Sequence, residues 1–396
     1  MPDTYAGLPM VDSSRTPASR RLLLVHSSSD LYGSDLACLR IAAAAVASGW
    51  IVEVMLPAAG PLVAVLRAAG ATVHLIDPIV LRRADLSGPR ALLLPLRWTR
   101  LALALRAFAR ARPAYDVVHS NCAPTLGGAL IARWSGARHV WYVHELFTSP
   151  RQRRLFDQVL RWSADAVLAC SNAALAQFPR VVAAGIGKVA YEPVEVRTGI
   201  VTTEPLAGQV PVVVCVGRLN SWKGQEVLID AIARLRARGI EVRAELVGSV
   251  FREETQFERR LRAQVDDLGI AEHVDFLGER RDALEIVGRA DIAVVPSTRP
   301  EPFGMTLVEA MALGRPVVAT AAGGPAEIVT DGVDGLLVPL RDPVALADAL
   351  QRLIEDPAFA RSLGINARSR AADFTSVMMT TKVLGCYESL LAMGRR

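Results

Sequence analysis

The fold is decided by the stretch Asp291-Ile-Ala-Val-Val-Pro-Ser-Thr-Arg-Pro-Glu-Pro-Phe-Gly-Met-Thr-Leu-Val-Glu-Ala-Met-Ala-Leu-Gly-Arg-Pro-Val-Val-Ala-Thr320. The apolar run at 292–295 predicts a buried strand, which a loop rich in proline and glycine follows. A helical pattern then runs from about 305 to 313 and stops at Gly314, and residues 316–320 predict the next strand. Strand, loop, helix and strand in this order indicate an α/β fold.

Two carboxylates, Glu301 and Glu309, flank the end of this loop and the first helical turns, with a run of backbone amides between them. Exposed amides and the positive end of the helix dipole attract phosphate and sugar oxygens. In an open α/β sheet, ligands bind outside the carboxyl ends of the strands, where this loop would lie. A structural interpretation stays open, because Thr306 to Glu309 fits a capping box in which Glu309 binds only the helix start.

The segment Glu301-Pro-Phe-Gly-Met-Thr-Leu-Val-Glu309 resembles the Glu-x7-Glu signature of retaining glycosyltransferases of family 4, which have the GT-B fold. The following Gly-Arg-Pro-Val-Val-Ala-Thr and Gly-Gly-Pro-Ala-Glu-Ile-Val stretches are also similar to that family. The resemblance implies that Glu309 holds the ribose of a nucleotide and that Glu301 touches a hydroxyl of the donor sugar. It further implies that the sugar and diphosphate are lined by Phe303, Gly304, Met305, Thr306 and Leu307.

A second motif follows a predicted strand at 212–216, where Gly217-Arg218 is followed by Lys223-Gly224 and a helical pattern. These residues resemble the family's Gly-Arg and Lys-Gly pair, which grips the donor diphosphate. The resemblance implies that Arg218 and Lys223 stabilise the departing diphosphate without a metal ion. The sequence also contains no Asp-x-Asp ligand pair, and we expect no metal site and no cofactor.

The first half of the chain begins with a predicted strand at 22–26, a polar loop at 27–34 and a helix from about 36 to 47, as a nucleotide-binding layer does. The loop Leu31-Tyr-Gly-Ser-Asp35 resembles the family's Gly-Gly-x-Glu loop. Gly33 is retained, whereas Ser34 and Asp35 depart from the pattern. The resemblance implies that the backbone at Gly33 approaches the donor phosphates and the acceptor.

His144 stands at the end of another predicted strand, in Tyr142-Val-His144-Glu145. The resemblance implies a position near the donor sugar or the acceptor, and a role in catalysis. A hydrogen-bonded structural histidine is the alternative. Further along, Tyr191-Glu-Pro-Val-Glu195 stands where the family has Asn-Gly-x-Asp, which is a clear departure from the pattern.

Strands and helices alternate along both halves of the chain, and this βαβ rhythm predicts parallel strands covered on both faces. The predicted fold class is α/β, of GT-B type, with two facing Rossmann-like domains, parallel sheets and a cleft between them that holds the active site. We expect a flexible tail at 1–20, an acceptor-binding domain at 21–197, a linker at 198–210, a nucleotide-sugar-binding domain at 211–373, and a final helix at 374–396 that packs back on the first domain.

Composition narrows the cellular setting. The five cysteines are odd in number and show no paired spacing, which favours reduced thiols in a cytoplasmic protein over disulfides or a zinc site. The first twenty residues are polar and do not resemble a signal peptide. No apolar run approaches the roughly 18 residues that span a bilayer.

Charge is unevenly distributed. Residues 1–200 carry 22 lysines and arginines against 13 acidic residues, a net +9, whereas residues 201–396 carry 23 against 27, a net −4. A basic half indicates an anionic partner. The helical pattern at 92–112 contains Trp98 and arginines that include those at 97, 100, 106 and 110, which predicts a basic amphipathic helix able to lie on anionic lipid, or an ordinary surface helix. Arg151-Gln-Arg-Arg154 adds a second basic cluster.

Nucleic-acid binding is not expected, because interleaved aromatic residues and a known reading motif are lacking.

The sequence therefore predicts a retaining glycosyltransferase that moves a sugar from a UDP- or GDP-linked donor to a hydroxyl. The stretches Val118-His-Ser-Asn121 and Val140-Trp-Tyr-Val-His144-Glu145 resemble enzymes of bacterial envelope or exopolysaccharide synthesis, which implies a lipid-linked or polysaccharide acceptor at the inner face of the cytoplasmic membrane. The alternatives are a natural-product enzyme with a small-molecule acceptor, a non-catalytic subunit, and a nucleotide-sugar epimerase.

Overall fold

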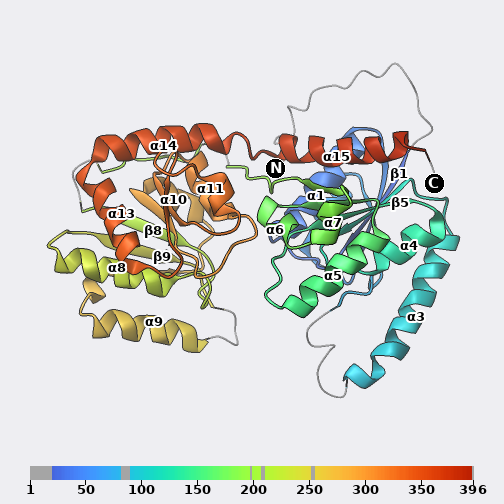
Figure 1. Ribbon diagram of the computed structural model, residues 1–396, viewed down its shortest axis with the longest axis horizontal. Helices are drawn as coiled ribbons and strands as arrows, with labels where there is room; N and C mark the ends of the chain where they lie inside the picture. The colour runs from blue at the N-terminus through green and yellow to red at the C-terminus, as the bar shows by residue number, and fades with distance from the viewer. Residues whose placement is uncertain (1–19, 82–89, 197–198, 207–209, 251–254, 395–396) are drawn as a thin grey trace. The chain divides into compact units, whose positions relative to one another are not determined.

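The computed structural model describes residues 20–81, 90–196, 199–206, 210–250 and 255–394. Contacts divide the chain into two units (Figure 1): residues up to Glu192 together with those from Ser376 onward, and residues Pro193–Thr375. The predicted tail at 1–20 lies, except for Arg20, outside the described residues. Part of the predicted linker at 198–210 lies outside them as well.

In the described part of the first unit, parallel strands form a seven-stranded sheet in the order β3-β2-β1-β4-β5-β6-β7. Its strands are β1 (Arg21–His26), β2 (Ile51–Leu56), β3 (Thr72–Leu75), β4 (Val117–Asn121), β5 (Arg138–Val143), β6 (Ala166–Ala169) and β7 (Gly187–Val189). Its helices are α1 (Gly33–Ala47), α2 (Pro61–Ala68), α3 (Arg90–Arg110), α4 (Gly127–Ser135), α5 (Pro150–Ser163), α6 (Asn172–Ala176), α7 (Pro179–Ala183) and α15 (Ser376–Ala392).

The described part of the second unit contains a six-stranded parallel sheet in the order β10-β9-β8-β11-β12-β13. Its strands are β8 (Val212–Val216), β9 (Arg243–Val247), β10 (Val274–Gly278), β11 (Ile292–Val295), β12 (Val317–Thr320) and β13 (Leu336–Val338). Its helices are α8 (Gln225–Ala237), α9 (Thr255–Asp267), η2 (Ala271–His273), α10 (Ala283–Arg289), α11 (Met305–Ala312), α12 (Pro325–Ile328), α13 (Pro343–Glu355) and α14 (Pro357–Ala371).

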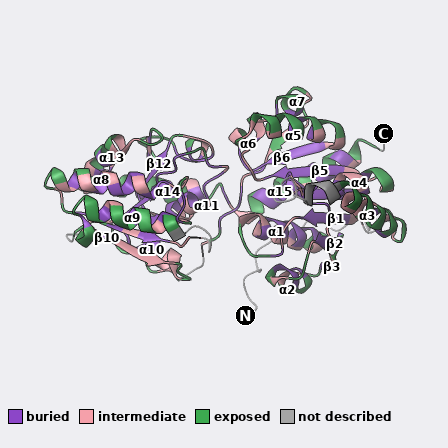
Figure 2. Ribbon diagram, turned by 90° about the horizontal axis from the view of Figure 1, so that it is seen from below, coloured by how far each residue is buried: buried purple, intermediate pink, exposed green. Residues whose placement is uncertain are grey.

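The central strands are buried because helices cover both faces of each sheet (Figure 2). In β1 the consecutive residues Leu22 to Val25 have no exposed surface, and in β11 every residue is buried. Such continuous apolar runs suit parallel strands, which have no solvated face. The predicted class, an α/β fold with two parallel Rossmann-like sheets, is confirmed.

Each sheet has one point where the chain order reverses. In the first unit this point lies between β1 and β4, and in the second it lies between β8 and β11. At such a point the loops after two neighbouring strands leave in opposite directions and open a crevice at the carboxyl ends of the strands, where ligands of α/β proteins bind. The two switch points are therefore the first places to look for function.

Helix α15 belongs to the first unit although it comes last in the chain. It packs against α1, β5 and β6. Tyr387 of this helix is fully buried, and its hydroxyl oxygen lies 2.6 Å from Nδ1 of His119 in β4, within hydrogen-bond distance. This contact joins the end of the chain to the centre of the first sheet.

Two elements differ from the sequence-based expectation. Helix α1 begins at Gly33 and not near residue 36, because the Asp35 carboxylate accepts the Tyr32 N–H at 2.8 Å and stabilises an earlier helix start. Gly33, expected in a loop, is the first helical residue. Strand β7 was not predicted, since its three residues are too few to show a periodicity.

Acid should destabilise the first unit through His139. Burial lowers the pKa of this histidine to about 4, whereas an unfolded histidine titrates near 6.5. Between these values the unfolded chain binds a proton that the folded chain does not, so stability is lost as the pH falls below about 6.5. We expect His139→Gln to reduce the slope of unfolding free energy against pH by up to about 1.4 kcal/mol per unit. Urea unfolding of both proteins at pH 5 to 7 measures how their unfolding free energies depend on pH. Equal slopes in the two proteins would contradict this account.

Candidate functional site

The switch point of the second unit is built on a close backbone contact. Gly224, the residue before α8, has a φ of +77°, and a Cβ atom added there would lie 1.9 Å from the carbonyl oxygen of Pro296 after β11. Only glycine suits both the conformation and the contact. Thr298 ties the same loops together, because its N–H donates to the Trp222 carbonyl at 2.9 Å and its hydroxyl to the Ser221 carbonyl at 2.8 Å.

This contact brings Lys223 to Glu301. The Nζ of Lys223 lies 2.7 Å from Oε1 of Glu301, and the Ser297 hydroxyl donates to the same oxygen. Glu301 is only 3% exposed, and the N–H of Gly324 donates to its carbonyl at 2.8 Å. Gly323 adjoins it with a φ of +70°, where a Cβ would lie 2.1 Å from that carbonyl oxygen. Two predicted site residues, 78 positions apart, thus form one ion pair.

Arg218 lies on the same loop, after β8, and is exposed. Its carbonyl oxygen accepts a hydrogen bond of 3.1 Å from Nε2 of the buried Gln225. Gly248, after β9, packs so closely that a Cβ atom there would lie 2.0 Å from the Gly217 carbonyl oxygen. The backbone of Arg218 is therefore fixed, while its side chain stands at the solvent-facing edge of the switch point.

The helix start at α11 overturns the capping-box interpretation. The residue before the helix is Gly304, with a φ of +112°, so Thr306 is the second helical residue and cannot be the cap. Its Oγ1 is buried and has no hydrogen-bond partner among the described residues. Because the first N–H groups of a helix have no acceptor within it, the amides of Met305 and Thr306 are suited to bind an anion or a sugar oxygen.

The other residues predicted along this segment have different surroundings. Phe303 is buried and contacts the Phe374 ring edge to face, with 5.6 Å between centroids. Leu307 is fully buried, and its N–H donates to the Gly304 carbonyl at 3.1 Å, so its side chain is not suited to contact a ligand. Glu309 follows in the second turn of α11 and is half-buried.

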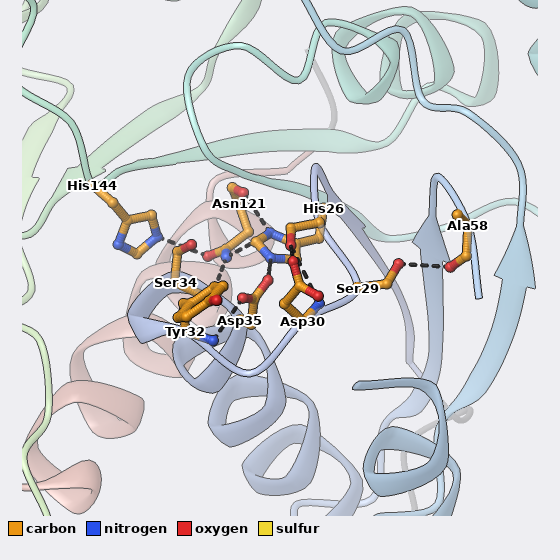
Figure 3. Close-up of polar contacts among 10 residues, drawn as sticks. His26, Ser29, Asp30, Tyr32, Ser34, Asp35, Ala58, Asn121 and His144 are labelled. Carbon is orange, nitrogen blue, oxygen red and sulfur yellow. Dashed lines mark hydrogen bonds and ion pairs between the residues drawn. The ribbon is translucent and has the colours of Figure 1, made fainter. Parts of the chain in front are cut away.

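The switch point of the first unit contains a chain of polar contacts (Figure 3). Nε2 of His26 lies 2.6 Å from Oδ1 of Asp35, and its Nδ1 lies 2.8 Å from the carbonyl oxygen of Asn121. The Asn121 amide nitrogen donates to the Ser34 carbonyl at 2.9 Å, and its Oδ1 lies 3.0 Å from Nε2 of His144. Sequence reasoning identified His144 but missed its direct partner Asn121 and the more distant Asp35, which joins the chain through His26.

His144 completes this chain through Glu192, whose Oε1 contacts Nδ1 of the imidazole. Burial alone would lower the pKa of His144, but the charge of Glu192 and its hydrogen bond outweigh burial and raise the pKa. For Asp35, burial favours the neutral form, yet the hydrogen bonds from His26 and from the Tyr32 N–H leave the pKa below its usual value. A signal for Glu192 existed in the sequence, in the departure of residues 191–195 from the family pattern.

Cys122 marks the end of β4 with unusual backbone geometry. Its φ of 126° is in the left-handed region, which a residue with a side chain rarely adopts. The Trp141 indole N–H donates to its carbonyl at 3.0 Å and helps to hold it. Such strain concentrates at functional sites. Burial raises the pKa of the Cys122 thiol well above its usual value, which disfavours the thiolate that a nucleophilic cysteine needs. All five cysteines are buried and unpaired.

Metal ligation finds no support in the described residues, where no group of three or more His, Cys, Asp or Glu side chains could hold an ion. At the switch point of the second unit, the ammonium of Lys223 and the first amides of α11 suit hydroxyl and phosphate ligands.

Two Rossmann-like units, with close glycine turns and charged groups at the switch point of the second, have the architecture of a glycosyltransferase of GT-B type. Models of two families match the chain: "Glycosyl transferases group 1" over residues 196–370, and "Glycosyltransferase Family 4" over residues 33–185. The chain belongs to the glycosyltransferases that these two models describe.

Named relatives agree with this assignment. A lipopolysaccharide core biosynthesis mannosyltransferase of Rhizobium leguminosarum is 34% identical over 256 residues, 63% of this chain and 72% of that protein. A D-inositol 3-phosphate glycosyltransferase of Actinosynnema mirum is 32% identical over 316 residues, 72% of this chain and 75% of that protein. The crystal structure of Anabaena HepE with UDP is 27% identical, with a TM-score of 0.78, and covers 93% of this chain and all of its own.

Substitutions that break the Lys223–Glu301 ion pair should show how much the two side chains stabilise each other. Glu301→Gln leaves the ammonium of Lys223 facing an uncharged group, and we expect a loss of about 1–3 kcal/mol in unfolding free energy. Lys223→Met should also destabilise, because it leaves a carboxylate that is 3% exposed without its counter-charge. The double variant should lose less than the sum of the two single losses. Urea unfolding of all four proteins measures this, and strict additivity would argue against the ion pair.

Proposed function

We propose that this chain is a retaining glycosyltransferase that moves a sugar from a nucleotide-diphosphate donor to a hydroxyl acceptor. The observation that carries the proposal is the Lys223–Glu301 contact of 2.7 Å at the switch point of the second unit, beside the N-terminal amides of α11. A cation, a carboxylate and free amides at one crevice match the phosphates and hydroxyls of a nucleotide sugar.

In this proposal the donor diphosphate takes the ammonium of Lys223 from Glu301. Negative charge develops on the departing diphosphate, and cations already in place stabilise it. Arg218 and Lys223 supply them. The Glu301 carboxylate then accepts a hydroxyl hydrogen of the donor sugar, while Glu309 accepts from the ribose and the amides of residues 303–307 line the sugar and phosphates.

Retention and metal independence belong to the same proposal. Retention usually involves a carboxylate nucleophile, and neither Glu301 nor Glu309 is assigned that role here. We assign the assisting base to the leaving phosphate itself, with the acceptor hydroxyl attacking from the face that the diphosphate leaves. Arg218 and Lys223 take the place that a divalent cation would occupy in a metal-dependent transferase.

The donor is proposed to be linked to UDP or GDP. Structures of Anabaena HepE with UDP and with UDP-glucose support a nucleotide-sugar donor. A lipid-linked or polysaccharide acceptor of the bacterial envelope is supported by the relative named for lipopolysaccharide core biosynthesis. A small-molecule acceptor is the second candidate, because other relatives are named for D-inositol 3-phosphate. A non-catalytic subunit is the third, and release of nucleotide diphosphate in an assay separates it from the other two.

Removing either cation should slow transfer without unfolding the protein. A hydrogen bond to a charged group contributes about 1.5–3 kcal/mol, and about 1.36 kcal/mol corresponds to a factor of ten in rate. We expect Arg218→Ala and Lys223→Ala each to lower kcat/KM by about 10- to 100-fold. The losses should not add, because both cations serve one leaving group.

Arg238→Ala is the matched control, since this exposed arginine lies at the opposite end of α8 from Lys223 and pairs with Asp348, so its loss should leave kcat/KM unchanged. Release of nucleotide diphosphate from UDP- and GDP-sugars measures the rate, with and without EDTA. Wild-type rates in both cation variants, or a strict requirement for magnesium, would overturn the mechanism.

Contact with an anionic membrane is proposed for the first unit, through the exposed face of α5. Arg151, Arg154 and Arg161 are exposed there, and Trp162 is 80% exposed. Their spacing of three, seven and one places them on one side of the helix. Such a mixture of arginine and tryptophan suits the headgroup region of anionic lipid. Among the described residues, no helix combines the length and apolar character needed to cross a bilayer.

On α3, the other basic helix, Trp98 is not an interfacial anchor. Its ring packs against the core cluster that contains Leu105 and Phe108. Arg97 forms an ion pair of 3.0 Å with Asp77, which reduces its free charge, while Arg100 and Arg106 are exposed. The amphipathic pattern of this helix is therefore explained by packing, with its arginines on the solvated side.

Vesicle binding tests the α5 face directly. We expect the protein to sediment with vesicles of phosphatidylglycerol and phosphatidylcholine, less so as salt rises. Trp162→Ala combined with Arg154→Glu and Arg161→Glu should abolish this binding. Arg100→Glu with Arg106→Glu on α3, a change of equal charge, should weaken it only slightly. Equal binding to pure phosphatidylcholine, or loss only in the α3 variant, would contradict the assignment.

A further inference from the structure

The orientation of the Asn121 side chain determines which atom His144 faces. Its amide nitrogen donates to the carbonyl oxygen of Ser34 at 2.9 Å, and a carbonyl oxygen can only accept. The other amide atom, Oδ1, therefore points at Nε2 of His144, 3.0 Å away. Since Oδ1 is an acceptor, Nε2 must carry a proton.

The second ring nitrogen meets a carboxylate. Nδ1 of His144 contacts Oε1 of Glu192, and both side chains are about 7% exposed. An ionised carboxylate only accepts hydrogen bonds, so Nδ1 carries a proton too. With acceptors at both nitrogens, the hydrogen bonds are satisfied by the doubly protonated imidazolium.

Glu192 requires this positive charge. Its second oxygen, Oε2, is buried and has no hydrogen-bond partner among the described residues. A buried carboxylate with one partner is costly unless that partner carries the opposite charge. Upstream, the Tyr142 hydroxyl donates to the carbonyl of Ala190 at 2.7 Å and holds the backbone two residues before Glu192. The Glu192 side chain is thus held against the His144 ring.

We propose that Glu192 is a positioning residue that keeps His144 doubly protonated, so that His144 serves the transfer reaction as a fixed positive charge and not as a proton acceptor. The inference rests on the proposed function for its role in transfer, but the charge itself is a property of the first unit alone. It departs from the general-base role that a histidine at a strand end most often suggests.

Neighbouring histidines show what happens without such a partner. His119 and His139 are buried in the same sheet, and burial lowers the pKa of both, to about 3 and about 4. For His144, burial also acts to lower the pKa, but the charge and hydrogen bond of Glu192 outweigh burial, and the pKa is raised. The groups with charge or ionisable character that face His144 are Glu192, Glu145, Asp35, His119 and Tyr142. The carboxylates among them all favour the imidazolium, and the neutral His119 does not oppose it.

Histidine NMR measures the charge without any substrate. The chain has six histidines, so a protein labelled at its imidazole rings gives few signals, and His144→Gln assigns the one that disappears. In the wild-type chain, the His144 ring should remain doubly protonated at pH 7 and lose its proton above the ordinary histidine range. Glu192→Gln should lower that midpoint by one unit or more, since an opposite charge in contact shifts a pKa by about 1–3 units.

The pH profile tests the role in transfer. A histidine with a raised pKa keeps its charge below that value and loses it as the pH rises, so kcat/KM should fall on the alkaline side with the His144 midpoint. In Glu192→Gln this alkaline limb should move to lower pH by the same interval as the NMR midpoint. The matched control is Glu195→Gln, an exposed glutamate three residues on, which should move neither.

The outcomes separate the two proposals. A His144 ring that is neutral at pH 7 in the wild-type chain overturns the inference, and this measurement does not depend on any variant folding. A shifted midpoint with an unmoved alkaline limb also overturns it, because the charge would then have no part in transfer. By contrast, absence of nucleotide diphosphate release from every donor would overturn the proposed function while leaving the His144 titration as it is.

Discussion

The contact between Gly224 and the carbonyl oxygen of Pro296 is the constraint on which the candidate donor site depends. A Cβ atom at residue 224 would lie 1.9 Å from that oxygen, so a side chain would force the loops after β8 and β11 apart. Because the loops touch, Nζ of Lys223 lies 2.7 Å from Oε1 of Glu301. The loop that contains Glu301 leads directly into α11. The proposed site for phosphates and hydroxyls thus depends on the absence of a side chain at one position.

At the switch point of the first unit, buried polar groups hold the neighbouring segments together. At its switch point, Asp35, His26, Asn121 and His144 form one chain of contacts that continues to Glu192. Buried polar groups are costly without partners, and each side chain of this chain contacts the next one along it. The pKa of His144 is therefore raised in a sheet where burial lowers the pKa of His119 and of His139.

The sequence was sufficient for the fold class and for the motifs near the second switch point, because apolar runs, glycine turns and spacing are local properties. It failed where a role depends on tertiary contact. Glu192 gains its partner from residue 144, 48 positions away, and no local pattern encodes that distance. The capping box at Thr306 fitted the sequence, but the positive φ of Gly304 starts the helix two residues earlier. Trp98 fitted the pattern of a membrane anchor, but its partly buried ring packs against the core of the first unit.

Hydrogen–deuterium exchange with and without saturating UDP or GDP tests the central claim most directly, because it maps bound nucleotide onto the backbone of the chain itself. The account predicts slowed exchange in two segments, the loop at 217–224 and the start of α11 at 302–307, since their amides lie at the switch point of the second sheet. Protection by nucleotide elsewhere, with both segments unchanged, would contradict the account.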